Sequence, residues 1–238
     1  MNFYVAIILF IFPLAGVWLS VVAQEIFSSR IKYFLSFSGA FLFGIVLLNL
    51  LPEVYEADSR APYFILGGFF FQIFMESLTQ GAEHGHIHIH NSDKKLPLPL
   101  LFGLGLHVFL ECFSLGSGFF NSAKEFPFAL GIGIHEIPAA FALMVILKHG
   151  NLSKTKMLMI GLLYSAVAPI GYFTGNYSQH LFSAESIALI MAVVAGTFFH
   201  ISTTVLFENS PDHRYNIKKI AFIICGITTA LLLTLIKA

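Results

Sequence analysis

Two short polar patterns lie inside long apolar stretches of this sequence: "HVFLE", which begins at His107, and "HEIP", which begins at His135. His107 and Glu111 are four residues apart, so an α-helix places both side chains on one face. His135 and Glu136 are adjacent and point about 100° apart on a helix, so one can face a site while the other braces it. Two imidazoles and two carboxylates form a donor set that suits Zn²⁺ or a similar divalent ion.

The composition indicates what surrounds these polar groups. The chain has 238 residues, of which 57% are hydrophobic and 11% charged, and its mean hydropathy is +0.81. Soluble domains carry about 25% charged residues. We therefore expect an integral membrane protein in a lipid bilayer. The formal net charge of zero gives no reason to expect a nucleic-acid partner.

The apolar stretches predict an all-α protein with eight transmembrane helices, because a membrane helix needs roughly 20 mostly apolar residues. The expected limits are 3–23, 33–51, 62–80, 97–120, 126–147, 157–176, 186–207 and 216–236. The first stretch could also be a signal peptide, with "VVA" before Gln24 as its cleavage site. However, it has no basic segment before it and is too long for that role, so we expect a helix.

The basic residues predict how the spans are oriented. If both termini lie outside, ten of the 13 Lys and Arg residues fall on the inner side and the other three on the outer side. The inner ten are Arg30, Lys32, Lys94, Lys95, Lys148, Lys154, Lys156, Arg214, Lys218 and Lys219. The excess of inner charge favours this orientation.

The position of Glu111 and Glu136 inside predicted membrane helices needs a physical explanation. A carboxylate at the centre of a membrane helix costs about 3 kcal/mol, so such residues mark a partner or a watery cavity. A buried His–Glu hydrogen bond that only holds helices together would be one explanation. A bound dication is the other, because it would neutralise two carboxylates where neither span carries Lys or Arg at its centre. Pro138 cannot donate to Ile134, which predicts a kink and a free carbonyl at the same depth.

The two patterns together resemble the fourth and fifth helices of the ZIP (zinc- and iron-regulated transporter-like) metal transporters. "NLLPE" at 49–53 and "APIGYFTG" at 168–175 resemble the second and sixth helices of that family. The resemblance implies a ZIP-like bundle of eight helices with both termini outside and a His-rich inner loop, here "EHGHIHIHNSDKK". It also implies alternating access, in which a mobile bundle that includes spans four and five moves against a scaffold.

The sequence also departs from the family pattern. Asn often follows the first His, Gly usually follows its acid, and an acid often follows His-Glu-Ile-Pro; this chain has Val108, Cys112 and Ala139 instead. Ala168 replaces an acid before the sixth-helix proline, and Asn49 replaces a His. In relatives with two adjacent metal sites, several of these groups build the second site. We therefore expect one metal ion, bound by His107, Glu111 and His135, with Glu136 as a ligand or as a brace.

The predicted function is transport of Zn²⁺, or of Fe²⁺, Mn²⁺ or Cd²⁺, into the cytoplasm by a single transmembrane domain spanning 1–238. The missing second-site groups leave a metal sensor or a transport-impaired relative as the alternative. An intramembrane metalloprotease is disfavoured, because its His-Glu-x-x-His pattern would need a second His where Ala139 stands. We therefore expect no enzyme activity. The charge bias and short loops favour a bacterial inner membrane, and a second copy of the chain is a candidate partner.

Weaker signals lie elsewhere. The inner loop at about 81–96 contains His84, His86, His88 and His90, which could bind metal loosely or serve only as a solvated loop. Glu76, Asn49 and His200 are candidate pathway residues, although lone polar groups in membrane helices are more often helix contacts. Cys112 and Cys225 lie in apolar runs, and we expect no disulfide between them.

Overall fold

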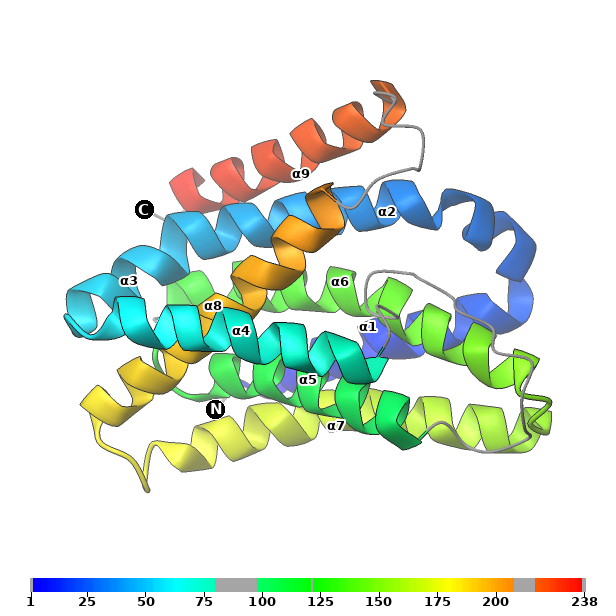
Figure 1. The fold of residues 1–238 in the computed structure, drawn as a ribbon, viewed down its shortest axis with the longest axis horizontal. Helices are drawn as coiled ribbons and strands as arrows, with labels where there is room; N and C mark the ends of the chain where they lie inside the picture. The colour runs from blue at the N-terminus through cyan, green and yellow to red at the C-terminus, as the bar shows by residue number, and fades with distance from the viewer. Residues whose placement is uncertain (1, 80–97, 121, 208–216, 237–238) are drawn as a thin grey trace.

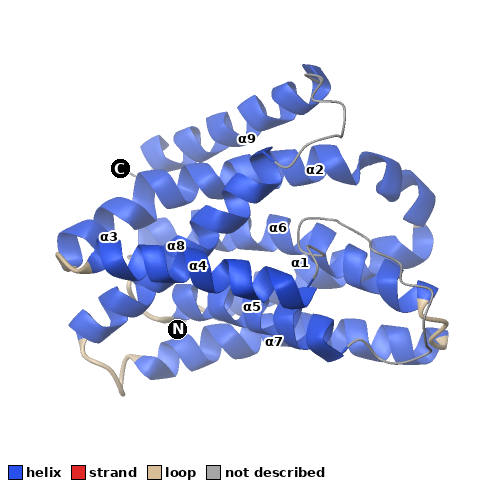
Figure 2. Cartoon of the chain, in the orientation of Figure 1, coloured by secondary structure: helices blue, strands red, loops and turns tan. Residues whose placement is uncertain are grey.

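The computed structural model describes residues 2–79, 98–120, 122–207 and 217–236. The helices are α1 (Phe3–Val22), α2 (Gln24–Ile45), the π-helical turn η1 (Val46–Leu50), α3 (Leu51–Ala57), α4 (Ala61–Thr79), α5 (Leu98–Gly116), α6 (Ser122–His149), α7 (Lys154–Ser178), α8 (Ala184–Phe207) and α9 (Ile217–Ile236). Eight stretches are long and apolar enough to cross a membrane, with α2, η1 and α3 forming one of them. The described chain is helices joined by short loops, without strands (Figure 2), which confirms the predicted fold class.

Several span limits differ from the sequence prediction; the second span, for example, continues to Ala57 rather than ending near residue 51. The second span begins at Gln24 rather than near residue 33, and only Ala23 separates α1 from α2. The residues just after Gln24 are largely polar, so a search for apolar stretches does not include them, although they are helical. The fourth span ends at Gly116 rather than near residue 120. Gly118 has φ of +73°, a left-handed conformation that glycine adopts without steric cost.

The second span widens into a π turn just before Pro52. Proline has no N–H to donate to the preceding turn, and a local π turn is one way for a helix to accommodate this. Asn49 lies in that turn and is buried. Its Nδ2 donates to the hydroxyl of Thr234 on α9 at 3.0 Å and to the carbonyl of Ile45 at 3.3 Å. Asn49 is therefore a helix contact, as lone polar groups in membrane helices usually are.

The helices form two bundles. In the first, here called the site bundle, α1 packs along α6, α5 packs along α7, and α1 also contacts α7. In the second, the flanking bundle, α2 packs along α9, α4 along α8, and α2 also on α8. In Figure 1, α2 and α9 lie side by side at the top, whereas α5 and α7 lie near the bottom. The bundles meet chiefly where α2 contacts α6 and where α4 contacts α5.

Three contacts bring the chain ends to one end of the molecule. Asn2 Nδ2 donates to Glu125 Oε2 at 2.6 Å at the start of α6. Lys124, the residue before, pairs with Glu53 of α3. Thr234, near the end of α9, meets the end of α2 through its hydrogen bond with Asn49. Termini at the same end are what an even number of spans requires; that this end faces outward remains a prediction from the basic residues.

Close backbone approaches hold the site bundle together. A β-carbon at Gly16 of α1 would lie 2.2 Å from the carbonyl oxygen of Ile137, so α1 presses against α6 beside His135 and Glu136. On α7, a β-carbon at Gly171 would lie 2.6 Å from the carbonyl oxygen of Phe109 in α5. Small residues permit such approaches between membrane helices. The helices that carry the polar patterns are thus fixed closely against their neighbours.

Burial separates the inner helices from the outer ones. Of the most apolar 18 residues of α6, 78% are buried inside the protein, against 11% for α9. Exposed apolar side chains such as Trp18, Phe70 and Leu235 face outward, where lipid tails would cover them. α6 runs as one helix through Pro127 and Pro138, and the predicted kink at Pro138 stays a prediction.

Candidate metal centre

The first half of the candidate site comes from one face of α5. His107 and Glu111 lie one helical turn apart and are both buried, with side-chain exposures of 3% and 1%. His107 Nε2 lies 3.4 Å from Glu111 Oε1, a separation longer than the usual 2.7–2.9 Å of a charge-assisted hydrogen bond. Ser114, the next residue on that stripe, donates its hydroxyl to the Glu111 carbonyl at 2.6 Å and so stays within its own helix.

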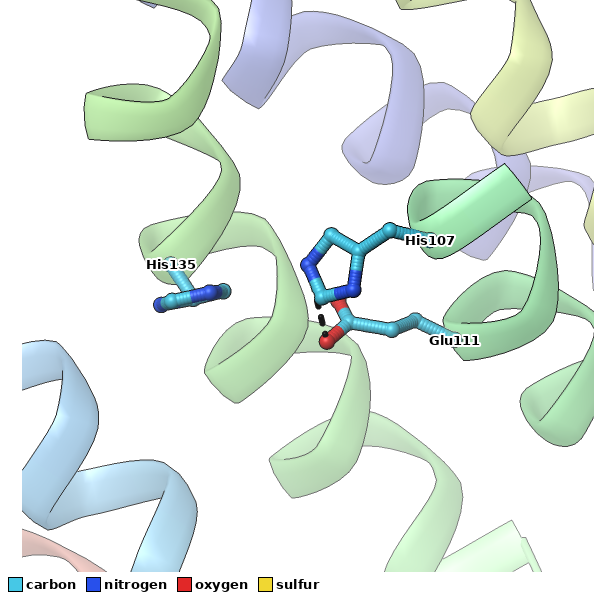
Figure 3. Close-up of side chains that lie close together, drawn as sticks. All are labelled: His107, Glu111 and His135. Atoms are coloured by element: carbon cyan, nitrogen blue, oxygen red, sulfur yellow. Dashed lines mark ion pairs between the residues drawn. The ribbon is translucent and has the colours of Figure 1, made fainter. Parts of the chain in front are cut away.

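The second half comes from α6, which passes beside α5. The His135 ring centroid lies 5.9 Å from that of His107, with the ring planes at 79°. Each of His107, Glu111 and His135 offers a ligand atom within 4.8 Å of the other two. Figure 3 shows the three side chains converging from the two helices, with the ion pair between His107 and Glu111 dashed. Within the described residues, these three are the one such group of His, Cys, Asp and Glu.

His135 is an unusual buried histidine. Its side chain is fully buried, and neither ring nitrogen has a hydrogen-bond partner among the residues that the structure describes. Buried polar atoms are nearly always hydrogen-bonded, and each exception needs an explanation. A neutral imidazole with a bare nitrogen is also the form in which histidine binds a metal ion. The surrounding described residues thus leave the ring nitrogens of His135 available to a group that is not protein, such as a metal ion.

Glu136 of α6 also lies next to these three residues. Its Oε1 lies 3.7 Å from His107 Nε2, and its Oε2 accepts a hydrogen bond from the hydroxyl of Tyr164 at 2.7 Å. Glu136 thus lies beside the three-residue group without being part of it. Tyr164, on α7, is a site residue that the sequence did not reveal. A lone tyrosine in an apolar span gives no signal until the contact between α6 and α7 is known.

Other polar residues of interest lie away from this cluster. Glu53 pairs with Lys124 at the end of the molecule where the termini lie, and Asn49 binds Thr234. Glu76 and His200 pair with each other between α4 and α8. The loop histidines His84, His86, His88 and His90, and Glu208, lie outside the described residues.

The positions where the sequence departs from the family pattern are closely packed. Val108, Cys112, Ala139 and Ala168 are all fully buried. A β-carbon at Gly171 would lie 3.2 Å from that of Cys112, so Cys112 packs against α7. Cys112 and Cys225 are both free in the structure. Val108, Ala139 and Ala168 supply packing around the cluster and offer no metal donor.

Eight stretches long and apolar enough to cross a membrane thus surround a buried group of His107, Glu111 and His135 whose ligand atoms are close enough to share a metal ion. Residues 96–234, more than half of the chain, match the sequence profile of the family described as ZIP Zinc transporter. The chain therefore belongs to the ZIP zinc transporter family, which confirms the resemblance drawn from its motifs. It is an integral membrane protein of a family that transports divalent metals. No curated protein matches the chain closely enough to refine this.

Proposed function

We propose that the chain carries Zn²⁺ or a related divalent transition metal into the cytoplasm through one ion-binding site. His107, Glu111 and His135 are the ligands in this proposal, and water completes the coordination. The observation that carries it is the convergence of three ligand atoms within 4.8 Å, among them the partnerless ring nitrogens of His135. Two atoms about 2.1 Å from a tetrahedral ion lie about 3.4 Å apart. The 3.4 Å between His107 Nε2 and Glu111 Oε1 agrees with that value.

Glu136 supports a site for one ion rather than two. A carboxylate that bridges two ions uses one oxygen for each. Here Oε1 lies toward His107, whereas Oε2 accepts the Tyr164 hydroxyl. A second ion on that oxygen would have to displace the tyrosine, and Ala139 and Ala168 supply no further ligand. In this proposal Glu136 adds negative charge beside the single bound ion and helps to position it.

The division into bundles supports alternating access. All ligands come from α5 and α6 of the site bundle, and Tyr164 comes from α7 of the same bundle. A movement of the site bundle against the flanking bundle would carry ligands and ion together, without breaking the coordination. In this proposal 1–238 is one transport domain. The ion moves from the side of the termini into the cytoplasm in this proposal, and the charge bias together with the short loops favours a bacterial inner membrane.

The chemistry of release fits this donor set. Imidazole and carboxylate ligands bind zinc-like ions without the very soft thiolates that retain them. A buried carboxylate attracts the cation strongly only while water is excluded. Opening toward the cytoplasm would admit water, weaken this attraction and favour dissociation.

The test is uptake of radioactive zinc by vesicles that contain the purified protein, with competing divalent metals. Saturable uptake by wild type that disappears in His107→Ala is expected. Binding without uptake would favour the alternative, a metal sensor or a transport-impaired relative. Metal binding by His107→Ala as tight as that of wild type would overturn the site assignment. A matched control is His180→Ala, because His180 is exposed in the turn that follows α7.

A further inference from the structure

A second His and Glu pair lies in the flanking bundle. His200 of α8 faces Glu76 of α4, with 3.6 Å between His200 Nε2 and Glu76 Oε2. The side chains are 9% and 26% exposed, respectively. The pair therefore opens further toward the surroundings than the cluster on α5 and α6. It shares no residue with that cluster.

The two helices are held together on the side of this pair. A β-carbon at Gly68 of α4 would lie 1.9 Å from the carbonyl oxygen of Val193, and one at Gly196 of α8 would lie 2.0 Å from that of Ile65. His200 follows Gly196 by one helical turn and stays on the same face. The crossing thus fixes where the imidazole meets α4.

The His200 ring is also oriented by an aromatic contact. The Phe69 ring lies edge to face with it, with centroids 4.9 Å apart and planes at 74°. Phe69, Gln72 and Glu76 are spaced by three and four residues, so they share one face of α4. Gln72 is buried, and its amide nitrogen has no hydrogen-bond partner in the described part of the chain. This face of α4 therefore has a polar group, the Gln72 amide, whose hydrogen-bonding potential is not satisfied by the contact with α8.

The separation of the pair suits a shared ion better than a direct hydrogen bond. A charge-assisted N–H···O bond is usually about 2.7–2.9 Å long, and the 3.6 Å here is clearly longer. The value is close to the roughly 3.4 Å expected between two ligands of one tetrahedral ion. The amide oxygen of Gln72 is a further hard donor on the same face, and amide nitrogen and oxygen can exchange places by rotation.

We propose that Glu76 and His200 form a second binding site for a divalent transition-metal ion, separate from the α5–α6 cluster, with its described ligands on α4 and α8. Within the described residues it has two side-chain ligands, with water and Gln72 to complete the shell, which makes it a weaker site than the cluster. Mixed N and O donors select zinc-like ions over Mg²⁺ and Ca²⁺, which prefer all-oxygen sites.

The site lies beside the contact between the two bundles. Gly103 of α5 approaches Thr79 of α4, where a β-carbon would lie 2.6 Å from Thr79 Cγ2. Glu76 precedes Thr79 by three residues, and His107 follows Gly103 by four. Because α4 and α5 run in opposite directions (Figure 1), each is about one turn from that crossing on the same side. The two sites therefore lie at similar depth on neighbouring helices, one in each bundle.

The experiment measures Co²⁺ binding by visible absorption, with the full chain in detergent. The background carries His107→Ala and His135→Ala, and the histidines at 84, 86, 88 and 90 are replaced by Ser, so that neither the cluster nor the loop binds the probe. We expect this background protein to bind one Co²⁺ per chain. Adding His200→Ala or Glu76→Gln should weaken that binding at least about ten-fold, because even an outer partner of a ligand is worth that much.

Two further variants make the outcome decisive. His180→Ala removes an exposed histidine elsewhere and should leave Co²⁺ binding unchanged. Glu76→His replaces the oxygen donor with nitrogen and should retain binding with a shifted absorption band. The proposal is overturned if the background protein binds no Co²⁺, or if His200→Ala and Glu76→Gln bind it as tightly as the background does. It is also overturned if Glu76→His loses Co²⁺ to the same extent as Glu76→Gln. None of these outcomes depends on transport through the cluster.

Discussion

The two bundles carry the same donor chemistry in different surroundings. In the site bundle, His107 and Glu111 share one helix and are almost completely buried, with His135 added from α6. In the flanking bundle, the histidine and the acid come from two helices and the acid is partly exposed. Water can solvate a partly exposed carboxylate, but a fully buried one needs a cation or a proton. Burial, more than residue type, therefore separates the strong candidate site from the weak one.

The largest expected effect is at the buried cluster. His107→Ala and Glu111→Gln should each weaken Zn²⁺ binding at least about 100-fold, since losing even an outer partner of a ligand costs about 10–100-fold. Calorimetry on purified protein would measure this. Glu76→Gln serves as the control and should leave the tightest site intact. If Glu76→Gln reduced that affinity as much as Glu111→Gln, the ranking of the two sites by burial would be wrong.

The next effect concerns the contact that builds the weaker site. Gly68→Ala places a methyl group against the carbonyl of Val193, a backbone atom that cannot rotate away, and should cost about 1–3 kcal/mol of stability. Gly67 is its neighbour, and a β-carbon there would meet nothing within 4 Å, so Gly67→Ala is a matched control. Thermal unfolding in detergent compares the two. Equal melting temperatures would contradict the close α4–α8 approach on which the Glu76–His200 geometry depends.

A smaller effect is expected at Tyr164. Its hydroxyl donates to Glu136 at 2.7 Å inside the site bundle, and a hydrogen bond to a charged group is worth about 1.5–3 kcal/mol. Tyr164→Phe should weaken Zn²⁺ binding about ten-fold while one ion per chain remains bound. Tyr177→Phe, at an exposed position on the same helix, is the control. An unchanged affinity in Tyr164→Phe would indicate that Glu136 takes no part in holding the ion.

Much of the site bundle could be predicted from sequence because its signals are local. His107 and Glu111 lie four residues apart on one helix, and polar groups inside an apolar run are conspicuous. The count of eight spans follows from length and hydropathy for the same reason. The convergence of His135 on His107 was harder, since it depends on how α5 and α6 pack. The occurrence of a His and a Glu in each of two consecutive spans suggested it, and the family resemblance supplied the particular ligand set.

The parts that sequence patterns did not reveal are contacts between distant segments. Tyr164 lies 28 residues from Glu136, and nothing local connects them. Gly16 looks like any packing glycine until the carbonyl of Ile137 is found beside it. His200 and Glu76 stand out in the sequence only as separate polar residues, because their pairing depends on the α4–α8 crossing. The shapes of the helix surfaces decide which helices pack together in a membrane protein. Hydropathy says little about these pairings.

A further prediction concerns the contact between the bundles. Lys124 of α6 pairs with Glu53 of α3, and both are partly buried. Such ion pairs are worth about 0–1 kcal/mol. If the bundles move relative to each other, Lys124→Gln should change the rate of zinc uptake by up to about five-fold and leave the Zn²⁺ affinity unchanged. Vesicle uptake and calorimetry on the same preparation separate the two quantities. A changed affinity with an unchanged rate would speak against movement at this contact.

The smallest effect is expected at a group of ion pairs that lies within one bundle and does not connect the two bundles. Arg60, in the turn between α3 and α4, pairs with Asp58 and with Glu185 of α8, all in or beside the flanking bundle. The Arg60 guanidinium lowers the pKa of Asp58 below its usual 3.8, chiefly through the hydrogen bonds that Asp58 accepts from Arg60. A carboxyl group with a lowered pKa adds stability above about pH 3.8 and loses it as the pH falls through its lower folded value.

Because the Arg60 side chain is half exposed and water screens its charge, Arg60→Ala should lower the melting temperature only slightly at pH 7. The difference from wild type should shrink further as the pH falls below 3.8, since Asp58 becomes protonated in both proteins. Zinc uptake should stay at the wild-type rate, in contrast to Lys124→Gln, because no contact between the bundles is lost. Melting curves at pH values from about 3 to 7 and vesicle uptake at neutral pH test both parts. A slowed uptake in Arg60→Ala would mean that the flanking bundle itself rearranges, and that the division into one moving and one stationary bundle is too simple.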